Sequence, residues 1–203
     1  MSKKIIAIIL VILGLLAITA GAIFIFNQDT KNEGAKQGGA TMNKDGKAIV
    51  VYFSAQNHTK NVANKIAANV GADIFEIEPV QAYTEDDLSW TDSNSRVSRE
   101  HNDESLQTIE LKSTTVPNWD EYDTVFIGYP IWWGGSSWVV DSFVKKVDFG
   151  NKTVIPFCTS HSSGLGSSDT DLKAKATGGN WQPGHRFSQD ATDAEIKTWT
   201  DSL

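Results

Sequence analysis

The sequence predicts an α/β domain, a doubly wound parallel sheet with helices on both faces. Short apolar, β-branched runs alternate with amphipathic segments, which is the pattern of strand–helix–strand units. The runs contain few polar residues, as strands buried on both faces require. Polar, glycine-rich loops follow several of them. A chain of 203 residues with 40% hydrophobic content supplies one ordinary domain and an appendage.

The appendage is expected at residues 1–26, as a membrane anchor. After Lys3 and Lys4, residues 5–26 carry no charge and are long enough to cross a bilayer as a helix. The two lysines predict a cytoplasmic N-terminus and an extracytoplasmic domain in the cell membrane. A secreted protein with a cleaved signal is the alternative, although the apolar run continues past the small residues at 20–22. Residues 27–46 are expected to be a flexible linker.

The domain itself, residues 47–203, is expected to begin with a strand at 48–53. Residues 60–70 place apolar side chains at helical spacing, which predicts a helix with one buried face. The other elements expected are strands at 73–78, 124–129, 153–158 and 185–188, and helices at 138–147 and 193–203.

Residues 79–116 fit no strand. They are rich in Asp, Glu, Ser and Thr, with Tyr83, Trp90 and a candidate helix near 97–106. An excursion of this length in a compact domain is more often functional than idle, so a cover over the site is expected here.

Ligands of open α/β sheets bind at the carboxyl ends of the strands, so the loops after the first, third and fourth strands are the candidate site. The first loop, 54–59, offers hydroxyls, an amide and backbone N–H groups at a helix N-terminus, a combination that suits a phosphate. The alternative is that Ser54 and Thr59 only cap the helix.

The second loop, 128–137, carries the adjacent Trp132 and Trp133 before two glycines, which suits a flat ring system. These tryptophans could instead fill the core. However, adjacent loop residues cannot easily both point inward, so one is expected to be exposed. The third loop, 159–168, is polar and glycine-rich and is able to hydrogen-bond the edge of a polar ring.

With these motifs in order, residues 48–203 resemble the flavodoxins, in particular the branch that reads Gly-Tyr-Pro-Ile-Trp-Trp at 128–133 and is followed here by Phe-Cys-Thr-Ser at 157–160. The resemblance implies five parallel strands in the order 2-1-3-4-5 and non-covalently bound flavin mononucleotide (FMN). It implies phosphate contacts from Ser54, Gln56, Asn57, His58 and Thr59. It implies contacts to the isoalloxazine ring from Pro130, Ile131, Trp132, Trp133 and Gly134. It implies contacts to the ring edge from Thr159, Ser160, His161, Ser162 and Gly164.

The phosphate loop departs from the family pattern. Gln56, Asn57 and His58 stand where the family usually has Thr, Gly and Asn, although Asn tolerates the left-handed backbone that such a turn needs. His161 likewise replaces a usual glycine beside the ring.

The function expected is membrane-tethered electron transfer, with a redox partner protein or a small-molecule electron donor or acceptor. FMN would carry the redox chemistry, so no catalytic side chain is required. One alternative is an NAD(P)H- or quinone-linked FMN reductase. Another is a flavin-free interaction module on the same scaffold, because a fold does not fix a function.

Composition argues against several other classes. Beyond residue 40 lie 14 of the 18 basic and 23 of the 25 acidic side chains, a net charge of −9 that disfavours nucleic acid. The four histidines lack metal-ligand spacing, so no metal is expected. The single cysteine, Cys158, sits in an apolar run and is expected to be buried and inert. A serine hydrolase built on Ser160 and His161 lacks the Gly-x-Ser-x-Gly elbow.

Overall fold

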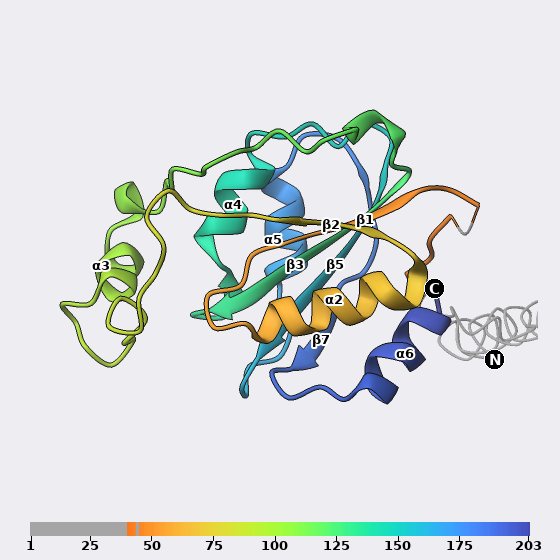
Figure 1. Ribbon diagram of the computed structural model, residues 1–203. Coiled ribbons are helices and arrows are strands. Elements are labelled where there is room, and N and C mark those ends of the chain that lie inside the picture. The colour runs from red at the N-terminus through yellow and green to blue at the C-terminus, as the bar shows by residue number, and fades with distance from the viewer. Residues whose placement is uncertain (1–39, 44) are drawn as a thin grey trace, which may run out of the picture. The chain divides into compact units, whose positions relative to one another are not determined.

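Seven strands form one sheet in the part of the chain that the computed structural model describes, residues 40–43 and 45–203 (Figure 1). The order along the sheet is β2-β1-β3-β5-β6, with β4 paired to β3 and β7 paired to β5. The strands are β1 (Ala48–Tyr52), β2 (Asp73–Glu76), β3 (Thr124–Trp132), β4 (Gly135–Ser136), β5 (Thr153–Ser160), β6 (Asn180–Trp181) and β7 (His185–Ser188).

The expected anchor at 1–26 and most of the expected linker lie outside the described residues. Within 40–43 and 45–203, no helix combines the length and the apolar character needed to cross a bilayer.

The parallel core of the sheet is β1, β3 and β5. Strand β3 pairs with β1 through residues 124–128 and with β5 through residues 124–130. All five residues of β1 are buried, and so are the first six of β3. This double burial is what the apolar runs predicted, since a central parallel strand is covered on both faces.

The expectation of five strands was wrong in two places. The fifth position is divided, because β6 pairs with residues 153–154 of β5 and β7 pairs with residues 157–160. Pro183 lies between the two pieces and has no N–H to donate to the ladder. The other addition is β4. It follows a turn at Trp133 and Gly134 and pairs antiparallel with Ile131 and Trp132.

The helices cover both faces of the sheet, as expected. Residues of α2 (His58–Val70) and α6 (Asp193–Asp201) belong to one buried cluster, whereas α4 (Trp138–Val144) and α5 (Ser168–Lys175) supply the other (Figure 1). Helix α5 was not expected from the sequence. It buries only Ser168 and Leu172, so it carries no apolar stripe that periodicity would reveal.

The excursion at 79–116 contains α3 (Arg96–Asn102) and the 3-10 helix η1 (Glu104–Leu106); a second 3-10 helix, η2 (Trp119–Glu121), precedes β3. Its two ends are tied together, because the Val80 N–H donates to the Glu110 carbonyl and the Lys112 N–H donates to the Glu78 carbonyl. Figure 1 shows α3 beyond the carboxyl end of β3. The candidate helix at 97–106 is therefore present as α3 and η1.

Gly128 provides a test of the packing at the centre of the sheet. A Cβ at this position would overlap the ring of Phe157, its fully buried neighbour on β5. We expect Gly128→Ala to lower the free energy of unfolding by about 1–3 kcal/mol, because overpacking forces the strands to shift. Urea denaturation followed by circular dichroism measures the change.

Gly164→Ala is the matched control, since its added Cβ would meet nothing closer than 4.0 Å. It should alter the free energy by less than about 0.5 kcal/mol. Equal losses in the two variants would contradict this account of Gly128.

Candidate functional site

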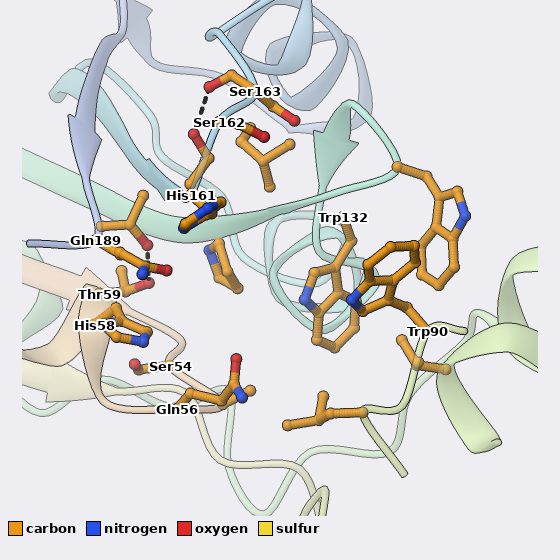
Figure 2. Close-up of a pocket in the computed structure, with 18 residues that line it drawn as sticks. Ser54, Gln56, His58, Thr59, Trp90, Trp132, His161, Ser162, Ser163 and Gln189 are labelled. Atoms are coloured by element: carbon orange, nitrogen blue, oxygen red, sulfur yellow. Dashed lines mark hydrogen bonds between the residues drawn. The ribbon is translucent and has the colours of Figure 1, made fainter. Parts of the chain in front are cut away.

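A cavity of about 500 Å³ lies at the carboxyl edge of the sheet (Figure 2). Its volume falls within the range of about 300–1,000 Å³ that is typical of small-molecule sites. The loops after β1, β3 and β5 all line it, together with the excursion and the residue after β7. The lining residues are Ser54, Ala55, Gln56, His58, Thr59, Leu88, Trp90, Val97, Pro130, Ile131, Trp132, Trp133, Thr159, Ser160, His161, Ser162, Ser163 and Gln189.

The first loop leaves polar groups without partners at the start of α2. The Ser54 Oγ is buried and makes no hydrogen bond among the described residues. Asn57 at the N-cap has a left-handed backbone, with φ of 65°, and its side chain does not cap the helix. The first N–H groups of an uncapped helix are free to bind a ligand and lie at the positive end of the helix dipole. This end of the cavity is therefore suited to an anion.

The third loop is fastened to the first loop and to β7. The hydroxyls of Thr59 and Thr159 share a buried hydrogen bond of 2.8 Å. On β7, the Arg186 guanidinium donates to the Ser160 Oγ at 2.9 Å and to the Ser160 carbonyl at 2.8 Å. The Ser160 hydroxyl in turn donates to the Ser163 carbonyl. These bonds fix the position of the loop backbone beside the cavity.

The two adjacent tryptophans take different positions, as expected. Trp132 is partly buried and packs against the rings of Phe53, Tyr83 and Trp138, with centroid separations of 5.8, 5.2 and 4.7 Å. Trp133 is 44% exposed, has a left-handed backbone with φ of 48°, and stacks on His101 at 4.3 Å. The indole of Trp132 thus borders the cavity and packs against three other aromatic rings.

A buried carboxylate connects the excursion to this aromatic wall. Glu100 is only 5% exposed and accepts hydrogen bonds from Arg96 Nε (2.7 Å), Tyr83 Oη (2.7 Å) and Trp138 Nε1 (2.6 Å). The Arg96 guanidinium also lies 3.8 Å from the centroid of the Tyr83 ring. Burial and the bond to Glu100 raise the pKa of Tyr83, so its hydroxyl remains a donor. The Glu100 carboxylate is thus paired with the Arg96 guanidinium and with the donors of Tyr83 and Trp138.

The excursion forms an apolar roof over the cavity with Leu88, Trp90 and Val97. The Trp90 side chain is 72% exposed, although the backbone of its segment is held by hydrogen bonds. The Ser98 Oγ donates to the Trp90 carbonyl at 3.3 Å, and the Val97 N–H donates to the Asp87 carbonyl at 2.9 Å.

Twelve of the fifteen site residues expected from the sequence line this one cavity. The other three, Asn57, Gly134 and Gly164, do not line it. Asn57 and Gly134, with φ of 65° and 82°, instead form the turns on either side. Residue reasoning missed six lining residues: Ala55, Leu88, Trp90, Val97, Ser163 and Gln189. Ala55 and Ser163 lie within loops that were already singled out. Leu88, Trp90 and Val97 belong to the excursion that was expected to cover the site, and they do line the cavity, whereas Gln189 depends on tertiary structure alone.

Cys158 lies next to the third loop but takes no part in the cavity. It is fully buried, which raises the pKa of its thiol to about 12. The expectation of a buried cysteine is confirmed, and such a thiol stays protonated at neutral pH.

Removal of the Glu100 carboxylate should loosen the roof. Glu100→Ala would leave the Arg96 side chain, which is only 12% exposed, without its charged partner, so we expect the free energy of unfolding to fall by about 3 kcal/mol. Amide hydrogen exchange within α3 should accelerate as well. Denaturant titration and exchange mass spectrometry measure the two effects.

The control is Asp201→Ala, which also breaks a pair four residues apart, with Lys197. That pair is 62% and 64% exposed and should contribute less than about 0.5 kcal/mol. Unchanged exchange in α3 after Glu100→Ala would show that the network does not hold the roof.

Comparison with known proteins places the chain in a family. A family model described as flavodoxin matches residues 47–203. No curated protein matches the chain. A solved protein from Bacteroides eggerthii DSM 20697, assigned as a flavoprotein, is 39% identical with a TM-score of 0.68, covering 76% of this chain and 96% of that one. Its counterpart from Bacteroides uniformis ATCC 8492 is 38% identical with a TM-score of 0.70, covering 77% and 98%.

A flavoprotein from Lactobacillus acidophilus NCFM, solved in complex with FMN, is 20% identical with a TM-score of 0.57, covering 76% of this chain and 99% of that one. This third likeness concerns the fold. The family match and the two Bacteroides structures agree with the motifs of the three loops, and the chain belongs to the flavodoxin family.

Proposed function

We propose that this protein binds FMN non-covalently in the cavity and acts as an electron-transfer flavoprotein. The observation that carries the proposal is the Ser54 Oγ, a buried polar atom without a partner beside the uncapped start of α2. A buried hydroxyl normally finds a hydrogen-bond partner, so an unpaired one beside a cavity indicates a missing ligand.

The polar end of the cavity fits a phosphate. Ser54 and the first N–H groups of α2 would donate hydrogen bonds, with Gln56 and His58 at the rim. Among the described residues that line the cavity there is no Lys or Arg. The phosphate would therefore be held by N–H groups, hydroxyls and the helix dipole, which together form an effective anion site.

The aromatic end fits the isoalloxazine ring. Trp132 presents a supported indole to the cavity, and the loop held by Arg186 offers backbone groups to the ring edge. When bound, FMN would supply the redox chemistry, accepting and donating electrons through its ring. The residues around it would orient the ring, exclude water and present polar groups at its edge. His58 and His161 line the cavity and do not fill it, which favours a flavin over a flavin-free interaction module.

A redox partner protein of basic character would suit this domain. The net charge of −9 beyond residue 40 favours encounter with a positively charged surface. Electron transfer between such a partner and this domain should slow as salt is added, because screening weakens the attraction.

The apolar stretch at 5–26 supports a tether to the cell membrane, with the domain on the extracytoplasmic side. The support is the length and charge pattern of the sequence alone. We expect the full-length protein to remain in the membrane fraction after a high-salt wash and to be released by detergent. Recovery in the soluble fraction would indicate the cleaved form.

FMN binding is tested by titrating the full-length apoprotein with FMN and with riboflavin, which lacks the phosphate, while following the quenching of flavin fluorescence. We expect tighter binding of FMN. Ser54→Ala should raise the Kd for FMN about tenfold, since a hydrogen bond to a charged group contributes about 1.5–3 kcal/mol. The Kd for riboflavin should stay the same.

Ser113→Ala, at an exposed serine remote from the cavity lining, is the matched control and should change neither Kd. Ser54→Ala should not lower the free energy of unfolding, because the native hydroxyl has no partner to lose. Failure of the wild-type protein to bind FMN at high micromolar concentration would favour the flavin-free module.

A further inference from the structure

The cavity has two chemically different ends, and the proposed FMN site does not account for all of the second. Figure 2 shows Ser54, His58 and Thr59 at one side and Trp132 and Trp90 at the other. The phosphate needs the first side, and the ring needs one indole wall. The roof formed by Leu88, Trp90 and Val97 comes from the excursion, outside the three loops that hold the flavin.

Trp90 is the unusual member of this roof. Its large apolar side chain is 72% exposed, the highest value among the exposed large hydrophobic residues of the described chain. Water contact of this kind is unfavourable for an indole. Hydrogen bonds nevertheless fix the backbone of the segment, since the Ser98 Oγ donates to the Trp90 carbonyl and the Val97 N–H donates to the Asp87 carbonyl. An exposed aromatic side chain on a hydrogen-bonded backbone at the rim of a cavity is suited to stacking on a planar molecule.

The charge of the site limits what that molecule is. A pyridine dinucleotide brings two or more negative charges, which proteins meet with Arg, Lys or a helix N-terminus. The described lining contains neither Lys nor Arg, and the start of α2 is assigned to the FMN phosphate. The segment before α3 adds the acidic side chains Glu85, Asp86, Asp87 and Asp92, whereas the basic Arg96 and Arg99 of α3 do not line the cavity. A negatively charged dinucleotide therefore matches the charge of this site poorly, whereas an uncharged molecule meets no electrostatic repulsion here.

We propose that the roof of Leu88, Trp90 and Val97 receives an uncharged planar quinone, which oxidises the reduced flavin. The inference rests on the proposed FMN function and names the class of its electron acceptor. Fully reduced FMN would pass two electrons and two protons to the quinone, which would leave the flavin oxidised and convert the two quinone carbonyl oxygens to hydroxyls. Trp90 acts by stacking on the quinone and not by proton transfer.

The experiment uses the full-length protein loaded with FMN and duroquinone as the probe, because its ring has no free position for thiol addition. Calorimetry measures duroquinone binding to the oxidised protein, and flavin absorbance measures the Kd for FMN. Trp90→Ala should raise the Kd for duroquinone at least tenfold and leave that for FMN within twofold. Trp90→Phe should keep most of the affinity.

Leu106→Ala is the matched control. It removes another exposed apolar side chain of the excursion, 47% exposed, that does not line the cavity, and it should change neither Kd.

Stopped-flow mixing of the dithionite-reduced protein with duroquinone should show flavin reoxidation that slows in Trp90→Ala at subsaturating quinone.

Three results would overturn the inference. In the first, Trp90→Ala weakens FMN as much as duroquinone, which would make Trp90 part of the flavin wall. In the second, Trp90→Ala leaves duroquinone binding unchanged. In the third, NADPH binds the oxidised protein more tightly than duroquinone does. Absence of FMN binding in the wild-type protein would instead overturn the proposed function itself, and is seen first in the absorbance titration.

Discussion

The parallel pairing of β3 with both β1 and β5 is the constraint from which the site follows. In the observed register, Tyr52, Gly128 and Phe157 lie on one line across the three strands. Each loop leaves the sheet shortly after that line, so residues that are 76 and 29 positions apart in sequence come together at one edge. Gly128 permits this arrangement, because the ring of Phe157 occupies the space that a side chain would need. The strand register thus determines where the cavity lies, and the loops determine which chemical groups line it.

A second layer of organisation joins the excursion to that edge. Glu100 binds groups on its own excursion and also the indole of Trp138 on α4, whose ring contacts Trp132 and Trp133. One buried carboxylate therefore fixes the roof and the aromatic wall relative to each other. Loss of one member of a buried polar network leaves the others without hydrogen-bond partners, which costs free energy, whereas a complete network is rigid. Here Arg96, Tyr83 and Trp138 all donate hydrogen bonds to Glu100. The roof behaves structurally as part of the site.

The sequence allowed the buried strands and most of the helices to be predicted, because their apolar patterns reflect burial on one or both faces. It did not reveal α5, whose burial depends on Leu172 and Ser168, or β4 and β6, which are two residues long. In the site, the three loops were predictable from their place after strands. The excursion was expected as a cover because of its length, but which of its side chains reach the cavity, namely Leu88, Trp90 and Val97, is decided by tertiary contacts, as is the approach of Gln189.

Three departures from ordinary folding rules lie around the cavity, although Thr124, Ser137 and Asn118 show comparable departures outside its lining. Ser54 leaves a buried hydroxyl unpaired, while Asn57 and Trp133 adopt a left-handed backbone that L-residues disfavour. Each departure costs free energy, of the order of 1–3 kcal/mol for a bulky residue such as Trp133. Other polar groups of the same loops do have hydrogen-bond partners, as the bond between the Thr59 and Thr159 hydroxyls shows. Unfavourable features beside a cavity are expected where binding a ligand recovers their cost, since a ligand that binds only the folded state stabilises it.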